Sequence, residues 1–381
     1  MNQRRKIETV EARIAGHWLF AVVTTDDGLK GIGEATYFAH PVAVQHIIGE
    51  LAEAYIGEDP FRAEYLQNRA MKHHCLRDMA LTGALSALDQ ALWDIKGKAL
   101  DVPVWELMGG RVRDRVRAIL LIEAKTPEEI FTNARRAAAE GFTAIKLKPF
   151  VGDWALKNRA TLLQSTAEIV RSVRDDLGWE IDIAIEIHRN LRPADAIEFA
   201  HMVRDIIPYF IEDPILPFSV DSNRHVASAM PAPVALAERN LNIWEFREYS
   251  DAHGVSILRP DIGSCGGFTQ MKKIAAIAES RHQTIVPHNF TSPVVTACHI
   301  QMAACTSNWD VQGYVREDRS PWQDVVHSVN VLKDGYLHIP ESPGIGIELN
   351  EAYLQTSTYR PFGTAFGHGA PLGPDGAVKH Q

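Results

Sequence analysis

The apolar residues after residue 117 fall into two alternating patterns. Short runs of β-branched and aliphatic residues predict strands, and apolar residues that recur at intervals of three and four between them predict amphipathic helices. We expect strands to begin near residues 118, 144, 181, 209, 234, 255, 284 and 309. We expect helices over residues 127–140, 155–177, 193–206, 219–229, 241–252, 267–280 and 292–305.

The first part of the chain has a different order, with strands grouped before helices. The short Ala15-Gly16 connection and the Asp27-Gly28 turn predict an antiparallel opening. Pro103 and Gly109-Gly110 then mark a boundary. Three strands followed by three helices are expected, over residues 6–14, 17–25, 29–34, 41–56, 60–73 and 81–100.

Eight strands with interleaved helices predict an α/β fold, a modified (β/α)8 TIM-type barrel. The chain has 381 residues, more than the roughly 250 that a barrel needs, which leaves room for a smaller domain. We expect an N-terminal α+β capping domain over residues 1–116 and the barrel over residues 117–345. A C-terminal segment, residues 346–381, is expected to pack on the capping domain and complete it.

Composition narrows the class of protein. The net charge of -9 argues against nucleic acid as a partner. Because no apolar run reaches membrane-spanning length and the charged start MNQRRK lacks a signal segment, we expect no membrane partner and a cytoplasmic location. We also expect a homo-oligomer that binds a small molecule. Reduced thiols are predicted, because no CxxC pair or disulfide framework joins the cysteines, Cys75, Cys265, Cys298 and Cys305.

Three acidic residues, Glu186, Glu212 and Glu238, each end a short apolar run, and they are equally spaced along the chain. In a parallel barrel such strand ends meet at one mouth. Mutual repulsion and desolvation would raise the pKa of each unpaired acid, whereas a hard divalent ion such as Mg2+ removes that cost. One such acid is more often only a polar residue at a strand end. The repetition favours a metal site.

The second and third predicted barrel strands carry further candidates. Lys146 and Lys148 lie two positions apart and therefore share a face of their strand. Inward-facing lysines beside three carboxylates are costly unless they serve an anionic substrate or remove a proton. Glu186 and His188 share a face by the same period, so an imidazole projects beside a predicted metal ligand.

The sixth and seventh predicted strands end in Asp261 and His288. The glycines after Asp261 suit a helix start that could bind an anion. Adjacent strand ends can bring a carboxylate and a histidine within hydrogen-bond reach, which orients the ring and raises its basicity. His288 is therefore a second candidate base, opposite the lysines.

Together with SALDQALWDIKGKALDVPVWELMGGR at the junction and SPGIGIELNEA near the end, these motifs resemble the enolase superfamily over essentially the whole chain. The lysine pair and the Asp261/His288 pair are similar to the mandelate racemase subgroup. The Glu186-x-His188 pair, the DIGSCGG segment and the short Ala15-Gly16 loop look most like its acid-sugar dehydratases, of the galactonate and mannonate dehydratase types.

The resemblance implies that the three acids bind one Mg2+ per subunit, which chelates the carboxylate of a small-molecule substrate. It implies that Lys148 or His288 removes the proton α to this carboxylate, and that His188 or His288 protonates the departing 3-hydroxyl. Lys146 would lower the basicity of Lys148 and help to hold the carboxylate. The reaction would be that of a hydro-lyase that converts a sugar acid, an aldonate or aldarate, to a 2-keto-3-deoxy acid.

Two positions depart from the family pattern. Glu186 stands where relatives more often have Asp, so this ligand is longer by one methylene. In the eighth strand, NWDVQGY places Gly313 where relatives usually carry Glu. Either a neighbour takes over the role of that Glu or the reaction differs. The neighbours in question are Asp310, Gln312, Tyr314 and Glu317.

Substrate contacts are harder to predict. Arg259 either points into the site, which would favour a second anionic group on the substrate, or forms a structural salt bridge. The capping domain is expected to close over the mouth of the barrel. Candidate contacts there and on the eighth strand are His17, Trp18, Tyr37, His40, His73, His74, Gln312 and Tyr314.

Two other functions stay open. A racemase, epimerase or cycloisomerase could use the same two bases, although His188 favours elimination because it adds an acid near the metal. Dipeptide epimerase and muconate cycloisomerase activities are disfavoured because Asp261 stands where those relatives have a lysine. Gly313 suggests a catalytically silent binding protein, but the retained lysines, acids and Asp/His pair argue against it.

Overall fold

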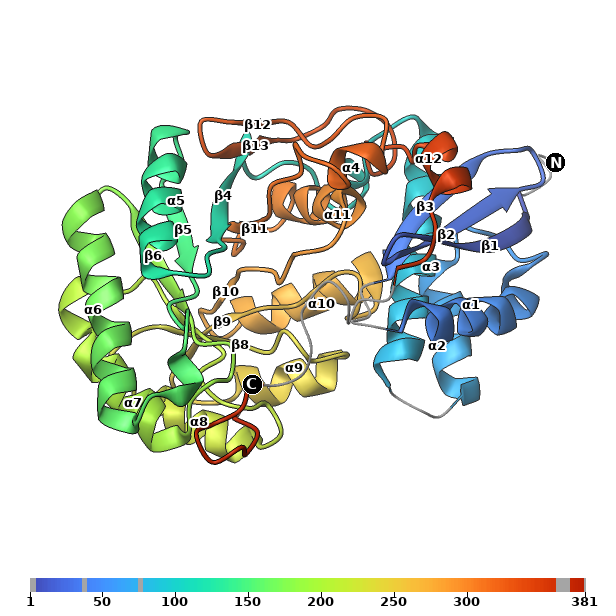
Figure 1. Cartoon of the computed structure of the whole chain (residues 1–381). Helices are drawn as coiled ribbons and strands as arrows, with labels where there is room; N and C mark the ends of the chain where they lie inside the picture. Colours follow the sequence, from blue (N-terminus) through green and yellow to red (C-terminus); the bar gives the residue numbers. More distant parts are fainter. Residues whose placement is uncertain (1–4, 36–39, 75–77, 361–370, 380–381) are drawn as a thin grey trace.

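The computed structural model describes residues 5–35, 40–74, 78–360 and 371–379. It shows a capping domain beside a barrel (Figure 1). The capping domain begins with an antiparallel sheet in the order β1-β2-β3. Ala15 pairs with Trp18 across the first hairpin, where Gly16 takes a φ of 62° that suits glycine. The elements of this domain are β1 (Ile7–Ala15), β2 (Trp18–Thr25), β3 (Lys30–Ala35), α1 (Pro41–Tyr55), α2 (Ala63–His74) and α3 (Met79–Leu100).

Close packing joins β3 to α3. A Cβ atom on Gly31 would lie 2.1 Å from the carbonyl oxygen of Ala91, and one on Gly33 would lie 2.1 Å from that of Ala87. Real Cβ atoms do not approach so closely, so glycine at both positions lets the strand lie directly on the helix backbone.

The predicted (β/α)8 barrel is confirmed. The strands β4 to β10 pair in parallel in chain order, and β11 pairs with β4. A parallel bridge between Ile285 and Trp309 brings the segment before β11 against β10 and closes the ring. The strands are β4 (Arg115–Ile122), β5 (Ala144–Leu147), β6 (Asp182–Glu186), β7 (Ile211–Glu212), β8 (Val234–Leu236), β9 (Val255–Leu258), β10 (Thr284–Ile285) and β11 (Gln312–Tyr314).

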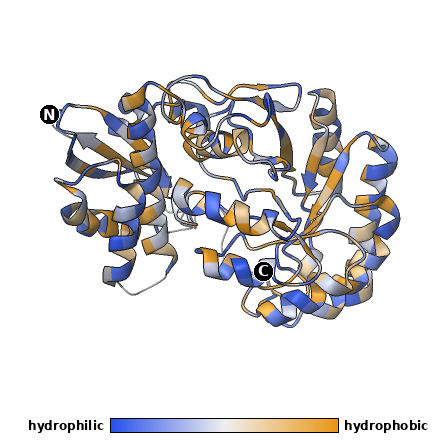
Figure 2. Ribbon diagram, turned by 180° about the vertical axis from the view of Figure 1, so that it is seen from behind, coloured by the Kyte–Doolittle hydropathy of each residue, from blue (hydrophilic) through white to orange (hydrophobic). Residues whose placement is uncertain are grey.

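Five barrel helices, α5, α6, α8, α9 and α11, begin where the sequence supplies a side-chain cap. The side chains of Thr126, Asn158, Ser219, Asn242 and Ser292 each accept a hydrogen bond from a backbone N–H in the first turn. Figure 2 shows hydrophobic colour on the strands and inner helix faces and hydrophilic colour on the outer faces. The helices are α5 (Pro127–Ala139), α6 (Arg159–Leu177), α7 (Pro193–Met202), α8 (Val220–Ala229), α9 (Ile243–Ser250), α10 (Gly267–Glu279) and α11 (Pro293–Ala304).

One buried side chain from each strand or the residue beside it fills the centre of the barrel. This layer sets the register of everything nearer the mouth, because side chains two positions further along a strand point the same way. Its members are Ile119, Ala144, Ala184, Phe210, Ala235, Ile257, Val286 and Val311.

The capping domain is fastened to the barrel by buried acids. Asp89 on α3 accepts hydrogen bonds from the backbone N–H and the hydroxyl of Thr269 at the start of α10, at 3.0 and 2.6 Å. Glu34 on β3 accepts from the backbone N–H and the hydroxyl of Ser292 at the start of α11, at 3.2 and 2.5 Å. Both acids lie at helix N-termini, and burial raises the pKa of each, to about 8 for Glu34 and to about 7 for Asp89.

The segment after the barrel returns to the capping domain. The backbone N–H of Ile345 donates to Asp94 on α3, and Glu351 forms an ion pair with Arg13 on β1. This segment includes the hairpin β12 (Leu332–Lys333) and β13 (Tyr336–His338), which the sequence pattern did not predict, and α12 (Glu351–Thr356). The short α4 (Val104–Leu107) connects the two domains. Of the helices in the described residues, none is long and apolar enough to cross a membrane.

Candidate active site

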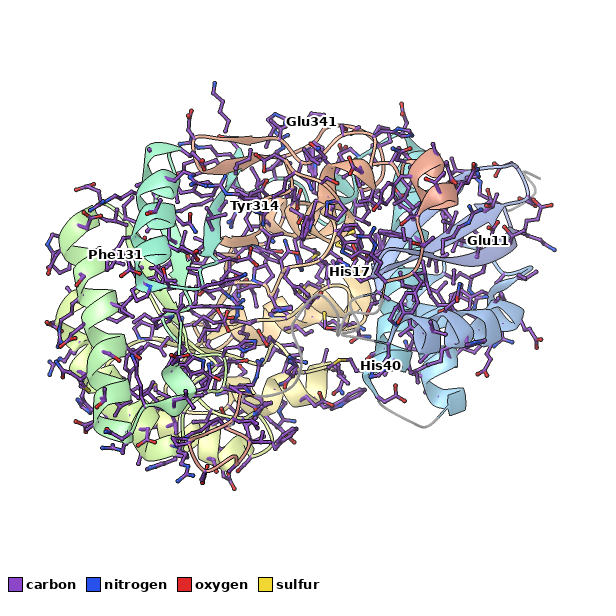
Figure 3. All side chains as sticks on the ribbon, in the orientation of Figure 1. Glu11, His17, His40, Phe131, Tyr314 and Glu341 are labelled. Atoms are coloured by element: carbon purple, nitrogen blue, oxygen red, sulfur yellow. The ribbon has the colours of Figure 1, made fainter. Side chains whose placement is uncertain are left out.

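A cavity of about 380 Å³, the catalytic cavity, opens at the carboxyl ends of the barrel strands. His17, in the β1–β2 turn, comes from the capping domain, and Figure 3 shows it at the boundary between the two domains. The other lining residues come from strand ends and the loops that follow them. They are Leu121, Glu123, Lys146, Lys148, Glu186, His188, Glu238, Arg239, His288, Asn289, Phe290, Val315, Arg319 and Trp322.

Strand alternation explains why these side chains meet. Lys146 lies two positions beyond Ala144 of the central layer, and Glu186 and Glu212 lie two beyond Ala184 and Phe210. Glu238 lies three positions beyond Ala235, out of step with the alternation. Ala237 has a φ of 86°, and this left-handed residue breaks the alternation before Glu238.

The acid cluster, Glu186, Glu212 and Glu238, has the composition of a metal site. One oxygen from each residue lies within 4.8 Å of the others, and all three residues are buried. Glu186 Oε1 is a buried oxygen with no hydrogen-bond partner among the described residues. An unpaired buried carboxylate oxygen is costly, and a hard cation would satisfy it. The residues present therefore fit a metal ion.

Cationic side chains surround the acid cluster. Lys146 Nζ lies 2.6 Å from Glu186 Oε2 and 2.8 Å from Glu212 Oε1. Burial alone would lower the pKa of Lys146, but the two carboxylates raise it above its usual value, so this lysine stays protonated. Burial would raise the pKa of Glu186, yet Lys146 and Lys148 hold it below its usual range. Lys146 thus neutralises acids and is not available as a base.

The structure distinguishes between the two roles expected for Arg259. Its side chain is 2% exposed and does not line the catalytic cavity. Its Nε lies 2.9 Å from Glu212 Oε1, and its Nη1 donates to the carbonyl of Val286. Arg259 therefore forms the structural ion pair that was one of its two expected roles, beneath the site and not in contact with substrate.

Arg189 is a buried residue that sequence reasoning missed. Its Nη1 donates to Asp213 Oδ2 at 2.7 Å and to Glu238 Oε1 at 2.6 Å, and its Nη2 lies 2.8 Å from His188 Nε2. His188 and Arg189 have φ values of 54° and 67°, a conformation that glycine adopts far more readily. No glycine marks this turn in the sequence, so the pattern carried no signal of it.

Arginine donates hydrogen bonds and cannot accept them, so His188 Nε2 is the acceptor in its contact with Arg189. Burial, followed by the charges of Arg189 and Lys148, lowers the pKa of His188 to about 4. The imidazole is therefore neutral at neutral pH, with its hydrogen on Nδ1. In this state His188 can donate a hydrogen bond from Nδ1, whereas Nε2 already accepts from Arg189 and the low pKa makes the ring a weak base.

Asp261 and His288, which follow the adjacent strands β9 and β10, form a hydrogen-bonded pair. His288 Nδ1 lies 2.8 Å from Asp261 Oδ2, and Asp261 Oδ1 accepts from the backbone N–H of Gly263. Nδ1–H therefore donates to the carboxylate, which fixes the ring and leaves Nε2 at the acid cluster, 3.7 Å from Glu238 Oε2. This arrangement can take up or deliver a proton.

Lys148 and His288 approach the cavity from different sides. Lys148 follows β5 and His288 follows β10, and β4 and β11 stand between these strands. Lys148 lines the cavity and is electrostatically coupled to Glu186 and His188. The site thus offers an amine and an imidazole on separate walls.

Close packing explains why position 313 is a glycine. A Cβ atom there would lie 2.9 Å from the carbonyl oxygen of Pro287 and 3.7 Å from Asn289 Cβ. Asn289 Nδ2 donates to the carbonyl of Gly313 and to the hydroxyl of Thr296, and Asn289 lines the cavity. Asn289 Oδ1 is buried and has no partner among the described residues, so it can accept from a substrate hydroxyl.

The residues expected to replace an acid at position 313 do not line the cavity. Gln312 and Glu317 are fully buried, and Tyr314 is 4% exposed within the barrel (Figure 3). Asn330 Nδ2 donates to Glu317, and burial raises the pKa of that acid to about 7. Gln312 and Tyr314 are therefore packing residues here and not direct substrate contacts.

Of the other capping-domain residues expected to contact the substrate, those that the structure describes do not line the catalytic cavity. Trp18 is 3% exposed and packs edge-on against Trp322, with ring centroids 5.7 Å apart, so it supports a lining residue without lining the cavity. His40 is exposed beside α1. Tyr37 and the side chains of His73 and His74 lie outside the described residues. Trp322, Phe290, Arg239 and Arg319 line the cavity and were not predicted.

Family models match most of the chain. Residues 9–109 match the mandelate racemase / muconate lactonizing enzyme N-terminal domain, and residues 129–353 match the enolase C-terminal domain-like family.

Similar proteins extend this match. D-galactonate dehydratase of Variovorax paradoxus is 30% identical over 92% of this chain and 93% of its own length, and that of Ralstonia nicotianae is 30% identical over 90% and 91%. A crystal structure from Agrobacterium radiobacter, assigned as a galactarate dehydratase and bound to sodium and L-malate, superposes with a TM-score of 0.93. It is 28% identical and covers 99% of this chain and 100% of that one. The chain therefore belongs to the mandelate racemase / muconate lactonizing enzyme family of the enolase superfamily and is a hydro-lyase of the acid-sugar dehydratase-like kind.

Proposed function

We propose that this protein is a Mg2+-dependent dehydratase that removes the proton α to the carboxylate of a sugar acid and eliminates the 3-hydroxyl, giving a 2-keto-3-deoxy acid. The observation that carries the proposal is the acid cluster with its unpartnered Glu186 oxygen. Two of its members, Glu186 and Glu238, line the same cavity as Lys148 and His288. The similarity to D-galactonate dehydratases supports elimination over other reactions of the same site.

The acid cluster would hold Mg2+, because three carboxylates supply the hard oxygen ligands that this ion prefers. When bound, Mg2+ would hold the substrate carboxylate and offset the negative charge that develops on its oxygens. Lys146, protonated between Glu186 and Glu212, adds fixed positive charge at the same place.

Lys148 and His288 are the groups placed to move protons. Because they stand on separate walls, they reach opposite faces of a bound substrate, and the configuration at C2 decides which one takes the α-proton. Because Nδ1–H of His288 donates to Asp261, Nε2 is the nitrogen that would deliver a proton to the departing hydroxyl. His188 and Asn289 are placed to bind and orient the hydroxyls.

Racemisation or epimerisation at C2 is the second candidate, because two proton-transfer groups on opposite walls are what such a reaction needs. The two reactions differ in their products. Elimination forms a keto acid, whereas isomerisation only exchanges the C2 proton with solvent and inverts the carbon.

The deciding experiment is a screen of aldonates and aldarates with the full-length protein in Mg2+, read by a keto-acid assay and by NMR in D2O. We expect keto-acid formation from at least one acid. Exchange or inversion at C2 without keto acid would make the protein an isomerase. Neither product nor exchange with any acid, together with no Mg2+ binding by calorimetry, would overturn both enzyme functions.

A further inference from the structure

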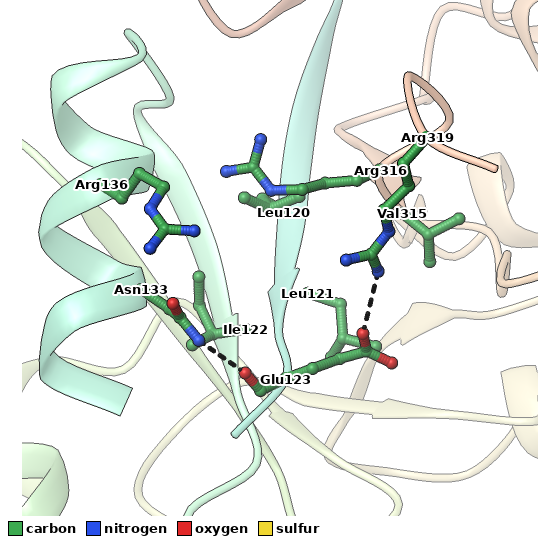
Figure 4. A pocket seen from close by; sticks show the side chains of 9 residues that line it. All are labelled: Leu120, Leu121, Ile122, Glu123, Asn133, Arg136, Val315, Arg316 and Arg319. Atoms are coloured by element: carbon green, nitrogen blue, oxygen red, sulfur yellow. Dashed lines mark hydrogen bonds and ion pairs between the residues drawn. The ribbon is translucent and has the colours of Figure 1, made fainter. Parts of the chain in front are cut away.

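A second, smaller cavity of about 90 Å³, the arginine cavity, adjoins the catalytic cavity. Leu121, Glu123, Val315 and Arg319 line both, so the two cavities meet at the end of β4. Figure 4 shows Arg136 extending from α5 and Arg316 from the segment after β11, toward each other across β4. Arg319 lies at the shared boundary, where its guanidinium faces Glu123.

Positive charge is in excess at this boundary. Arg316 is paired with Glu140 and Arg319 with Glu123. The side chain of Arg136 makes no hydrogen bond or ion pair with any residue of the described ranges. Three guanidinium groups thus face two carboxylates, and each guanidinium carries a fixed charge at any accessible pH.

The ion pair between Arg319 and Glu123 is weak enough for a ligand to replace Glu123. A single contact of 3.3 Å joins its Nη2 to Glu123 Oε2, and the two side chains are 52% and 69% exposed. Exposed pairs of this kind contribute at most about 1 kcal/mol, and a planar guanidinium binds an incoming carboxylate through two parallel hydrogen bonds. Arg319 can therefore accept a substrate anion at little cost.

Three other arginines lie near the catalytic cavity, and each pairs with an acid of the acid cluster. Arg239, which lines the cavity, lies 3.5 Å from Glu238 Oε1. Arg189 and Arg259 are buried in pairs with Asp213, Glu238 and Glu212. The contacts of these two buried residues hold the acid cluster and leave no exposed donor. Charge available to a second anionic group is therefore found at the Arg319 boundary, away from the acids that would hold the first carboxylate.

From this we propose that the substrate is a dicarboxylic sugar acid, an aldarate, whose second carboxylate binds Arg319 at the junction of the two cavities, with Arg136 and Arg316 adding positive potential. The inference rests on the proposed function, because that function places the first carboxylate at the acid cluster. An aldonate ends in a neutral hydroxymethyl group, which offers Arg319 no negative charge to bind.

The test compares matched pairs of acids that differ only at C6: galactarate with galactonate, glucarate with gluconate, and mannarate with mannonate. The kcat/KM of the full-length protein in Mg2+ is measured for each. We expect the preferred acid to be a hexarate, favoured over its hexonate by about tenfold or more, as a charge-assisted contact implies.

Variants then test which arginine causes the preference for hexarates. Arg319→Gln should reduce the ratio of hexarate to hexonate kcat/KM about tenfold, mainly by raising the KM of the hexarate. Arg319→Lys should keep part of the preference, because it retains the charge and loses the two-pronged contact. Arg136→Gln should reduce the ratio by a smaller factor. The matched control is Arg135→Gln. Arg135 precedes Arg136 on α5, pairs with Asp176 and lines neither cavity.

The outcomes separate the inference from the function on which it rests. Dehydration that prefers hexonates, or a ratio that Arg319→Gln leaves unchanged, overturns the inference and leaves the dehydratase function standing. If no acid of either series reacts, the dehydratase function fails, and calorimetric titration with the same pairs decides the inference. Hexarate binding that Arg319→Gln weakens and Arg135→Gln does not supports the subsite, and no hexarate binding overturns it.

Discussion

At the scale of single residues, the buried ion pairs explain how three acids can share one small volume. Lys146 and Arg259 hold Glu212, Lys146 holds Glu186, and Arg189 holds Glu238. Lys146 alone contacts both oxygens of Glu212 and Oε2 of Glu186, whereas Glu186 Oε1 is left for another ligand. Partners of this kind orient ligands and tune their affinity for metal.

Arg189 gives the first prediction. Arg189→Met removes the contact to Glu238 and should weaken Mg2+ binding about 10- to 100-fold, because the ligand loses its orienting partner. Isothermal titration with Mg2+ measures this without reference to catalysis.

The control separates orientation from charge balance. Arg189→Met alone leaves Asp213 buried and unpaired, whereas Arg189→Met/Asp213→Asn restores neutrality. If the double variant binds Mg2+ as tightly as the wild type, Arg189 only neutralises Asp213 and the prediction is wrong.

Asp261 gives the second prediction. Asn at this position keeps the acceptor for the backbone N–H of Gly263 and turns an amide N–H toward His288 Nδ1. The ring must then accept at Nδ1 and carry its hydrogen on Nε2, the reverse of the wild-type tautomer. We expect kcat to fall on the order of 100-fold with little change in the melting temperature. An active Asp261→Asn variant would show that His288 moves no proton.

The site was predictable where side chains end regular strands. Glu186, Glu212, both lysines and the Asp/His pair follow from strand ends and a period of two, whereas Glu238 follows from its strand end alone. Arg189 was not predictable, because the left-handed turn that buries it has no glycine to signal it. Arg259 obeys the same period as Asp261, but the sequence does not say which inward-facing side chain lies below the cavity floor.

At the scale of elements, alternation of pattern predicted the barrel because each strand is one short apolar run between two amphipathic helices. The sequence pattern did not predict the β12–β13 hairpin because its strands have only two and three residues. The signal was present in Asp334-Gly335, a turn whose φ values of 50° and 73° match the favoured hairpin geometry.

The contact of β3 with α11 gives the third prediction. Burial raises the pKa of Glu34 from 4.5 to about 8. Between these values the unfolded chain has released the proton and the folded chain has kept it, so the free energy of unfolding falls as pH rises from 4.5 to 8. The slope is at most about 1.4 kcal/mol per pH unit.

Glu34→Gln cannot ionise, and its amide can still accept from the Ser292 N–H and donate to the Ser292 hydroxyl. We expect urea unfolding between pH 5 and 8 to show a smaller decline for the variant than for the wild type. Parallel curves for the two proteins would mean that Glu34 ionises normally in the folded state.

At the scale of the whole molecule, the capping domain has both a core of its own and a core shared with the barrel. One buried cluster draws only on residues 7 to 95, whereas Trp18, Phe20 and Ile32 belong to the cluster formed by residues of the barrel strands and the barrel helices. Asp89 adds a polar attachment, with two hydrogen bonds to the start of α10. We therefore expect the two domains to unfold together.

This coupling gives the last prediction. Mg2+ at the acid cluster contacts only the barrel, yet in a single cooperative transition it should stabilise both domains, by about 2.7 kcal/mol at a concentration of 100 times its Kd. Hydrogen exchange of β2 and α3 should slow with Mg2+ and recover with EDTA. Asp89→Ala leaves the two hydrogen-bond donors of Thr269 without their acceptor and weakens the contact between the domains. Mg2+ should then no longer protect β2 and α3 from exchange.

The control for this prediction is Glu53→Gln, on the exposed face of α1, which should keep the wild-type response. If Mg2+ protects the capping domain equally in the Asp89→Ala variant, the shared apolar core alone couples the domains, and the buried acid serves only to cap α10.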